Sequence, residues 1–309
     1  MSISKVKSVF ENVTVCDAWS LQLLQIKNSK RKGTTYCGRE ITLFPEGTLT
    51  NFLIEISEKY CSTDKGLEKM YESVTNYDGS TNDKTIYKLN AESELISDEY
   101  SNFITAIGKP DAEVDPLKFS ANAYVIIGKM ILGDDELSVK LISMQNPITT
   151  LKHKYLCSKG TFQEISDKVI SLRTTIDVVV INENVYMLTL AGEKLFNMER
   201  AYKAICKRQI TNIVDADIIN DAEMFNSIAS CGHNPRKFIS FNESHLQKLK
   251  AISSRRKISK KFSIPLDGDK FDMKYPGTAD KLVKLLCDRG MVDPFDDLPM
   301  EVSSSKKWE

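Results

Sequence analysis

The chain has 309 residues, which is enough for one large domain or two small ones. Its 42 basic and 42 acidic side chains cancel, which excludes a general attraction to polyanions and leaves local segregation of charge as the electrostatic route to one. No apolar run reaches the ~18 residues of a membrane span, residues 1–7 lack the apolar segment of a secretory signal, and the seven cysteines are scattered without a C-x-x-C pair, so a cytoplasmic protein is expected.

The amino-terminal part is predicted to contain two strands and a helix. The strands cover residues 13–27 and 34–44, and a basic turn joins them. A helix capped by Thr48 or Thr50 follows. The polar stretch 62–84 is predicted to be a flexible connection.

The next part reads as strands joined by short turns. Strands are predicted at 85–89, 121–132 and 137–144, and a helix from 97 to 107 separates the first two. The basic segment 151–159 then leads into a unit of helix, hairpin and helix.

That unit opens at Thr161-Phe-Gln-Glu164, a capping box that predicts a helix through Leu172. The runs 177–181 and 185–190 are predicted to be the two strands of the hairpin, and a helix extends to Gln209. Both strands are too continuously apolar for a solvated sheet face, so we expect them in the middle of the sheet.

The carboxy-terminal part continues with an acidic helix (215–229), a strand (236–241), a helix capped by Ser244, a hairpin (262–275) and a helix capped by Thr278. The predicted fold is α+β, with a mostly antiparallel mixed sheet built from hairpins and flanked by helices. We divide the chain into an N-terminal αβ region (1–80), an αβ core (81–290) and an acidic and polar tail (291–309).

The sharpest charge feature is the segment 244–266, which holds seven basic residues and no acidic one. Clusters of this kind bind phosphates, because each neutralised phosphate releases counterions. The alternative is a solvated helix face followed by a basic loop. The predicted phosphate contacts are Arg255, Arg256, Lys257, Lys260 and Lys261.

Other basic groups are predicted to support this segment. Arg200, Lys203 and Lys207 share one face of a predicted helix, although Glu199 can pair with Lys203, which favours an ordinary surface there. Lys152 and Lys154 precede the capped helix, whose first amides are themselves an anion site.

Signatures of an enzyme are weak. Cys231-Gly-His233 offers two zinc ligands where three or four are needed. Asp267, Asp269 and Asp272 resemble part of a metal-dependent nuclease pattern, but their spacing is too short and they fall in a predicted hairpin. Phosphate-binding glycine loops and nucleophile motifs are absent. We therefore predict no catalytic residue, no metal and no cofactor.

The order of elements from about Ile86 onwards resembles the bacterial KwaB-like family of the Kiwa anti-phage defence system. The resemblance is carried by the segments 86–89, 121–128, 177–181 with 185–188, 193–202, 215–225 and 236–239. It implies a cytosolic defence protein that binds DNA without cutting it and is gathered at the inner membrane by a membrane partner, KwaA. No family catalytic residue can be carried over to this sequence.

The leading hypothesis is a DNA-binding effector of phage defence that acts as a homo-oligomer with a membrane-embedded partner. Because no base-reading motif is visible, we expect sequence-independent binding to the backbone. Two alternatives stay open: a metal-dependent nuclease that uses Asp267, Asp269 or Asp272, and a non-catalytic scaffold that binds only protein.

Overall fold

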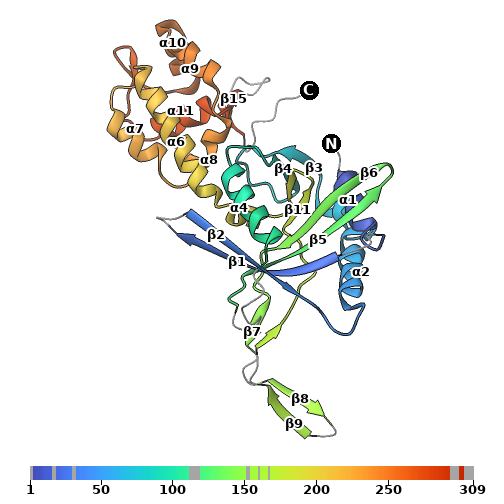
Figure 1. The fold of residues 1–309 in the computed structure, drawn as a ribbon. Coiled ribbons are helices and arrows are strands. Elements are labelled where there is room, and N and C mark those ends of the chain that lie inside the picture. Colours follow the sequence, from blue (N-terminus) through green and yellow to red (C-terminus); the bar gives the residue numbers. More distant parts are fainter. Residues whose placement is uncertain are drawn as a thin grey trace. The chain divides into compact units, whose positions relative to one another are not determined.

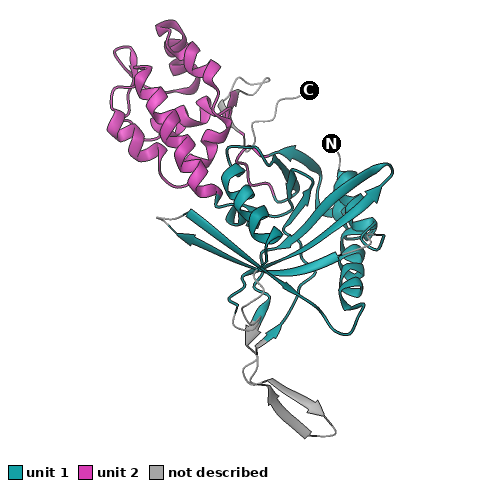
Figure 2. Ribbon diagram, in the orientation of Figure 1, with its two compact units in different colours: residues 1–76, 83–197 teal, residues 77–82, 198–309 magenta. Residues whose placement is uncertain are grey.

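The computed structural model describes residues 3–15, 19–29, 33–110, 119–150, 154–158, 161–165, 168–292 and 299–302 (Figure 1). The chain forms two compact units (Figure 2). Unit 1 comprises Met1–Asn76 and Asp83–Asn197, and unit 2 comprises Tyr77–Asn82 and Met198–Glu309. The division into 1–80, 81–290 and 291–309 was made from the order and composition of predicted elements and not from spatial contacts, so it stays a prediction.

Unit 1 is built on an eight-stranded sheet in the order β2-β1-β5-β6-β11-β12-β4-β3. Each neighbouring pair is antiparallel except β3 and β4, which are parallel. This mixed, mostly antiparallel sheet with flanking helices confirms the predicted α+β class. The strands of the sheet are β1 (Trp19–Ser29), β2 (Gly33–Ile41), β3 (Ser73–Asn76), β4 (Thr85–Asn90), β5 (Ala123–Leu132), β6 (Asp135–Ser143), β11 (Val178–Ile181) and β12 (Asn184–Met187).

The hairpin of β11 and β12 lies inside the sheet, as its apolar runs predict. All four residues of β11 are buried, and the strand is flanked by β6 and β12. The turn residue Asn182 adopts a φ of 54°, a conformation that asparagine tolerates better than most residues. Its side-chain oxygen also accepts the backbone N–H of Ser138 at 2.9 Å, which ties the turn to β6.

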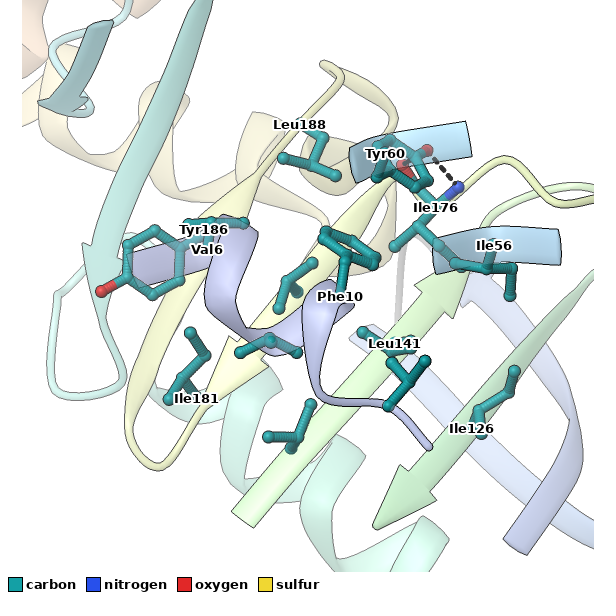
Figure 3. Close-up of a cluster of buried hydrophobic side chains, with 14 of the residues drawn as sticks. Val6, Phe10, Ile56, Tyr60, Ile126, Leu141, Ile176, Ile181, Tyr186 and Leu188 are labelled. Atoms are coloured by element: carbon teal, nitrogen blue, oxygen red, sulfur yellow. Dashed lines mark hydrogen bonds between the residues drawn. The ribbon is translucent and has the colours of Figure 1, made fainter. Parts of the chain in front are cut away.

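One face of the sheet packs against α1 (Ile3–Glu11) and α2 (Thr48–Cys61). Figure 3 shows Phe10 and Tyr60 from these helices over side chains of the sheet such as Leu141. The two rings stack with centroids 4.4 Å apart. The buried Tyr60 hydroxyl donates to the carbonyl of Ile176 and accepts its N–H, which removes the cost of burying the polar group.

A further helix, α4 (Ser97–Gly108), packs on β2. Phe103 of α4 is fully buried and meets Phe196 edge to face, with ring centroids 6.0 Å apart. The remaining elements of unit 1 are α3 (Leu67–Met70), β7 (Ile148–Thr150), β8 (Lys154–Ser158), β9 (Thr161–Ile165), β10 (Lys168–Ile170) and α5 (Ala191–Leu195).

Unit 2 is mostly helical, and Figure 1 shows α9 and α10 together at one end of it. Its buried side chains include Ile205, Phe225, Leu246 and Leu282, which come from four different helices. The elements are α6 (Met198–Asp215), α7 (Ala222–Ala229), α8 (Asn234–Lys237), η1 (Phe238–Ser240), α9 (Glu243–Leu249), α10 (Ile252–Phe262), β13 (Leu266–Asp267), β14 (Lys270–Phe271), α11 (Thr278–Leu286), β15 (Gly290–Val292) and β16 (Pro299–Glu301).

The helix predicted from the capping box at Thr161 is wrong. Residues 161–165 form β9, which pairs with β8, and residues 168–170 form β10, which pairs with β7. A capping box is a local signal of four residues, and Thr161, Phe162 and Ile165 are all residue types that favour strands. Pairing with the neighbouring strands β8 and β7 therefore decides the structure here, and the capping box does not.

Four further predictions from the sequence are also wrong. Residues 236–240 form α8 and η1 instead of a strand, and Pro235 lies in the first turn of α8. The stretch 62–84 contains α3 and β3 and buries Leu67 and Tyr71, so it is not a flexible connection. The predicted caps Ser244 and Thr278 follow the true N-cap residues, Asn242 and Gly277.

Candidate nucleic-acid interface

The basic segment forms two consecutive helices, α9 and α10, where the sequence predicted one helix and a loop. The side chain of Asn242 accepts the N–H of Ser244 at 3.0 Å and caps α9. The two helices are joined by only two residues, Lys250 and Ala251. The basic side chains of both helices are therefore held on ordered backbone.

Arg255 ties this helix pair together from the inside. Its side chain is only 7% exposed. The guanidinium donates to the carbonyls of Leu249 at 2.8 Å and Lys250 at 2.9 Å, and through Nε to the carbonyl of Asp269. The planar fork of arginine suits such a set of acceptors. Arg255 is thus occupied within the fold and does not present its charge to solvent.

The other basic side chains face water. We define the cationic surface as the exposed basic residues of α9, α10 and α11, which are Lys248, Arg256, Lys257, Lys260, Lys261 and Lys281. The ammonium of Lys281 donates to the carbonyls of Phe262 and Ser263 at 3.3 and 3.2 Å, which places it beside the end of α10. Residues from three helices therefore contribute to one positively charged region.

Few acids neutralise this surface within the part of the chain that the structure describes. Asp269 pairs with Arg256 at 2.9 Å, and solvent reaches both side chains. This ion pair therefore contributes only about 0–1 kcal/mol, and an external anion can replace Asp269 as the partner of Arg256. Asp280 of α11 instead accepts the side-chain amide of Asn234 at 2.8 Å. Among described residues, Lys248, Lys257, Lys260 and Lys261 have no ion-pair partner.

Like charges on α10 repel one another and lower the stability of the helix, and a bound anion would relieve this repulsion. Arg256 with Lys260, and Lys257 with Lys261, are like charges at i and i+4, each destabilising the helix by about 0.2–0.5 kcal/mol. The position of Lys260 and Lys261 in the last turn offsets part of this through the helix dipole. Such a charge pattern is more easily explained by an anionic partner than by the stability of the helix.

A cavity of about 350 Å³ lies next to this surface. Lys248 of α9 and Lys257 of α10 both line it, so both helices contribute a basic residue to the cavity. Leu249, Ile258, Phe262 and Leu285 also line it, and they give it a mainly apolar wall.

The supporting cations predicted from the sequence lie elsewhere. Arg200, Lys203 and Lys207 are exposed on α6, which packs mainly against α7, α8 and η1, whereas α10 packs against α9 and β14. Lys203 pairs with Glu199, as predicted. Lys154 lies in β8 of unit 1, so the predicted anion site at a helix start is wrong there, and Lys152 lies outside the described residues.

The carboxylates of the alternative nuclease reading are engaged with other groups. Asp272 accepts the Asn220 amide at 2.9 Å and the backbone N–H of Lys274 at 3.0 Å, and these bonds hold the pKa of its carboxyl below the usual range. Asp269 pairs with Arg256. Within the described residues, no three histidine, cysteine or acidic side chains gather as metal ligands, and this includes Cys231 and His233.

Residues 122–292 match the family model described as Kiwa protein KwaB-like, and this match covers more than half of the chain. The chain belongs to the KwaB-like family. The resemblance seen in the sequence is therefore confirmed, and membership gives the protein a role in anti-phage defence as part of the Kiwa system. The matched region runs from just before β5 to β15 and includes α9, α10 and four of the eight strands of the sheet, β5, β6, β11 and β12.

Comparisons with curated proteins and with solved structures found no match. In the described part of this KwaB-like chain, no helix has both the length and the apolar character needed to cross a membrane.

Two features of the interface were missed from the sequence. The burial of Arg255 could have been found from spacing, because Arg255, Ile258 and Phe262 recur at i, i+3 and i+7 and so share a helix face. The place of Lys281 in the cationic surface could not have been found from the sequence, because it depends on how α11 packs beside α10.

Proposed function

We propose that the chain is a DNA-binding component of Kiwa defence and that it holds the phosphate backbone at the cationic surface without cutting it. The single observation that carries this proposal is the group of exposed, mostly unpaired cations from α9, α10 and α11 on a chain of zero formal net charge. A polyanion is the partner that such segregated charge would attract.

The strength of binding follows from the number of cations. With at most six phosphate contacts, the logarithm of the binding constant should fall with the logarithm of salt concentration with a slope no steeper than about −5 on duplex DNA. Contacts of this kind carry no sequence information, so unrelated duplexes should bind alike.

The experiment reverses charge on α10. The variant Lys257→Glu, Lys260→Glu, Lys261→Glu should lose duplex binding, measured by fluorescence anisotropy at low salt. The matched control, Lys65→Glu, Lys69→Glu, Lys109→Glu, changes the same net charge at exposed positions of unit 1 and should bind as the wild type does. Equal binding by both triple variants would reject the cationic surface as the DNA site.

Cleavage is not part of the proposal. Because Asp269 and Asp272 are engaged with Arg256 and Asn220, we expect duplex DNA to stay intact with Mg²⁺ or Mn²⁺. Cleavage that disappears in Asp272→Ala would instead establish the nuclease alternative.

The proposal also includes a partner. In the Kiwa system we expect this chain to reside in the cytoplasm, to form a homo-oligomer and to be recruited to the inner membrane by a KwaA-like membrane protein. Membrane fractionation with and without that partner, and light scattering of the purified chain, test these points separately from DNA binding.

A further inference from the structure

The cavity between α9, α10 and α11 has the features of a site for a flat, partly polar group attached to a phosphate. Its wall is formed by Leu249, Ile258, Phe262 and Leu285, and its cations are Lys248 and Lys257. A volume of about 350 Å³ lies within the range of small-molecule sites, so the cavity has room for one nucleotide.

Two further residues give the cavity polar edges. Ser254 contributes a hydroxyl group. His245 lines the cavity, and its Nδ1 lies 3.1 Å from the carbonyl oxygen of Leu285. The same Nδ1 also lies 3.3 Å from a carboxylate oxygen of Asp288, so it donates toward acceptors of the fold, because a carbonyl or carboxylate oxygen can only accept.

We infer that this cavity receives an unpaired base of single-stranded DNA, stacked against Phe262, while Lys248 and Lys257 hold the adjacent phosphates. The inference rests on the proposed function and adds a preference for single strands over duplex. Single-strand sites in other proteins combine the same two elements, an aromatic face and a cationic track. An acyl chain fits less well, because it would leave the polar groups of Ser254 and His245 against hydrocarbon.

The test compares an oligothymidine of about twelve nucleotides, a length within the range of single-strand sites, with a duplex of equal length. Phe262→Ala removes the stacking surface, and Ser254→Trp fills the cavity. Each variant should lower the affinity for oligothymidine by about tenfold, as expected for the loss of one stacked base. Each should leave duplex affinity within about twofold of the wild type, because the phosphate contacts remain.

Salt dependence separates this inference from the proposed function. Stacking is not electrostatic, so the two cavity variants should weaken oligothymidine binding by the same factor at every salt concentration and leave the slope unchanged. The α10 triple reversal should instead change the slope. Thermal melting by circular dichroism confirms that each variant is folded, and duplex binding provides a second check.

Three outcomes are decisive. Tenfold weaker oligothymidine binding in both folded cavity variants, with duplex binding kept, supports the inference. Wild-type affinity for oligothymidine in both cavity variants overturns the inference. The proposed function still stands in that case if the α10 triple reversal loses its affinity for duplex DNA. Retention on anionic vesicles that Ser254→Trp abolishes, with oligothymidine binding unchanged, would assign the cavity to lipid and also overturn the inference.

Discussion

Arg255 and Arg256 are neighbours in the sequence with opposite roles in the structure, and replacing each by methionine should separate the two. Arg255→Met removes three hydrogen bonds from a buried guanidinium to carbonyl oxygens. Hydrogen bonds from charged groups contribute about 1.5–3 kcal/mol each, and methionine keeps part of the packing of the side-chain stem. Because three carbonyl oxygens lose a charged donor while the retained side-chain packing offsets part of the cost, we expect a net loss of about 3–5 kcal/mol.

That loss is large against the total stability of a domain, which is about 5–15 kcal/mol. For a unit of this size it should lower the melting temperature by about 10–20 °C. Arg256→Met breaks only the exposed ion pair with Asp269 and should change stability by less than about 1 kcal/mol.

Circular dichroism measures the melting of both variants, and hydrogen exchange of the α9 and α10 amides locates the loss. Tryptophan fluorescence is a poor reporter, because Trp19 belongs to unit 1 and the other tryptophan lies outside the described residues. Below its melting temperature, Arg255→Met should bind duplex DNA within about twofold of the wild type. A variant that melts like the wild type and still loses DNA would refute the structural role and return Arg255 to the binding surface.

Three other predictions test separate features of the molecule. Asp269→Asn removes the acid that competes for Arg256 and should raise duplex affinity about two- to fivefold by anisotropy, whereas unchanged affinity would show that Arg256 does not contact DNA. Leu141→Ala, at a fully buried site of the sheet, should cost about 2–5 kcal/mol in denaturant unfolding, and a loss below about 1 kcal/mol would contradict the packing described. Burial raises the pKa of Tyr71 to about 12 from about 10 in the unfolded chain, so the stability that the neutral hydroxyl contributes is complete below pH ~10 and falls by a few kcal/mol at most as the pH rises to ~12. Tyr71→Phe should remove that part of the alkaline sensitivity, and an unchanged alkaline melting curve would reject this assignment.

The sheet was predictable from the sequence wherever apolar content is continuous. The segment that became β11 is entirely β-branched and buried, and its strand identity and central place in the sheet were both predicted. Residues 161–165 are mixed in character, so their strand structure depends on the partner strand β8. The local capping signal could not reveal that partner.

The sequence was enough to locate the basic segment of the candidate interface, but not to tell which of its side chains face solvent. A count of charges located the basic run, because an acid-free stretch is visible without any structure. Which members of the run face water depends on the phase of α10, and this phase buries Arg255 while it exposes Arg256. A charge count treats the two alike, whereas the positions of Ile258 and Phe262 distinguish them.

Balanced net charge and a concentrated cationic surface have different consequences for the proposed DNA binding. At zero formal net charge, long-range attraction is weak, and the six cations act only within about one Debye length, which is ~8 Å at physiological salt. Non-specific binding through so few contacts lies near 10⁻⁴–10⁻⁶ M under these conditions. Oligomerisation or gathering by a partner would bring several such surfaces onto one DNA molecule and multiply this weak affinity. The proposed function therefore predicts that a monomeric form of the chain binds duplex DNA far more weakly than an assembled one.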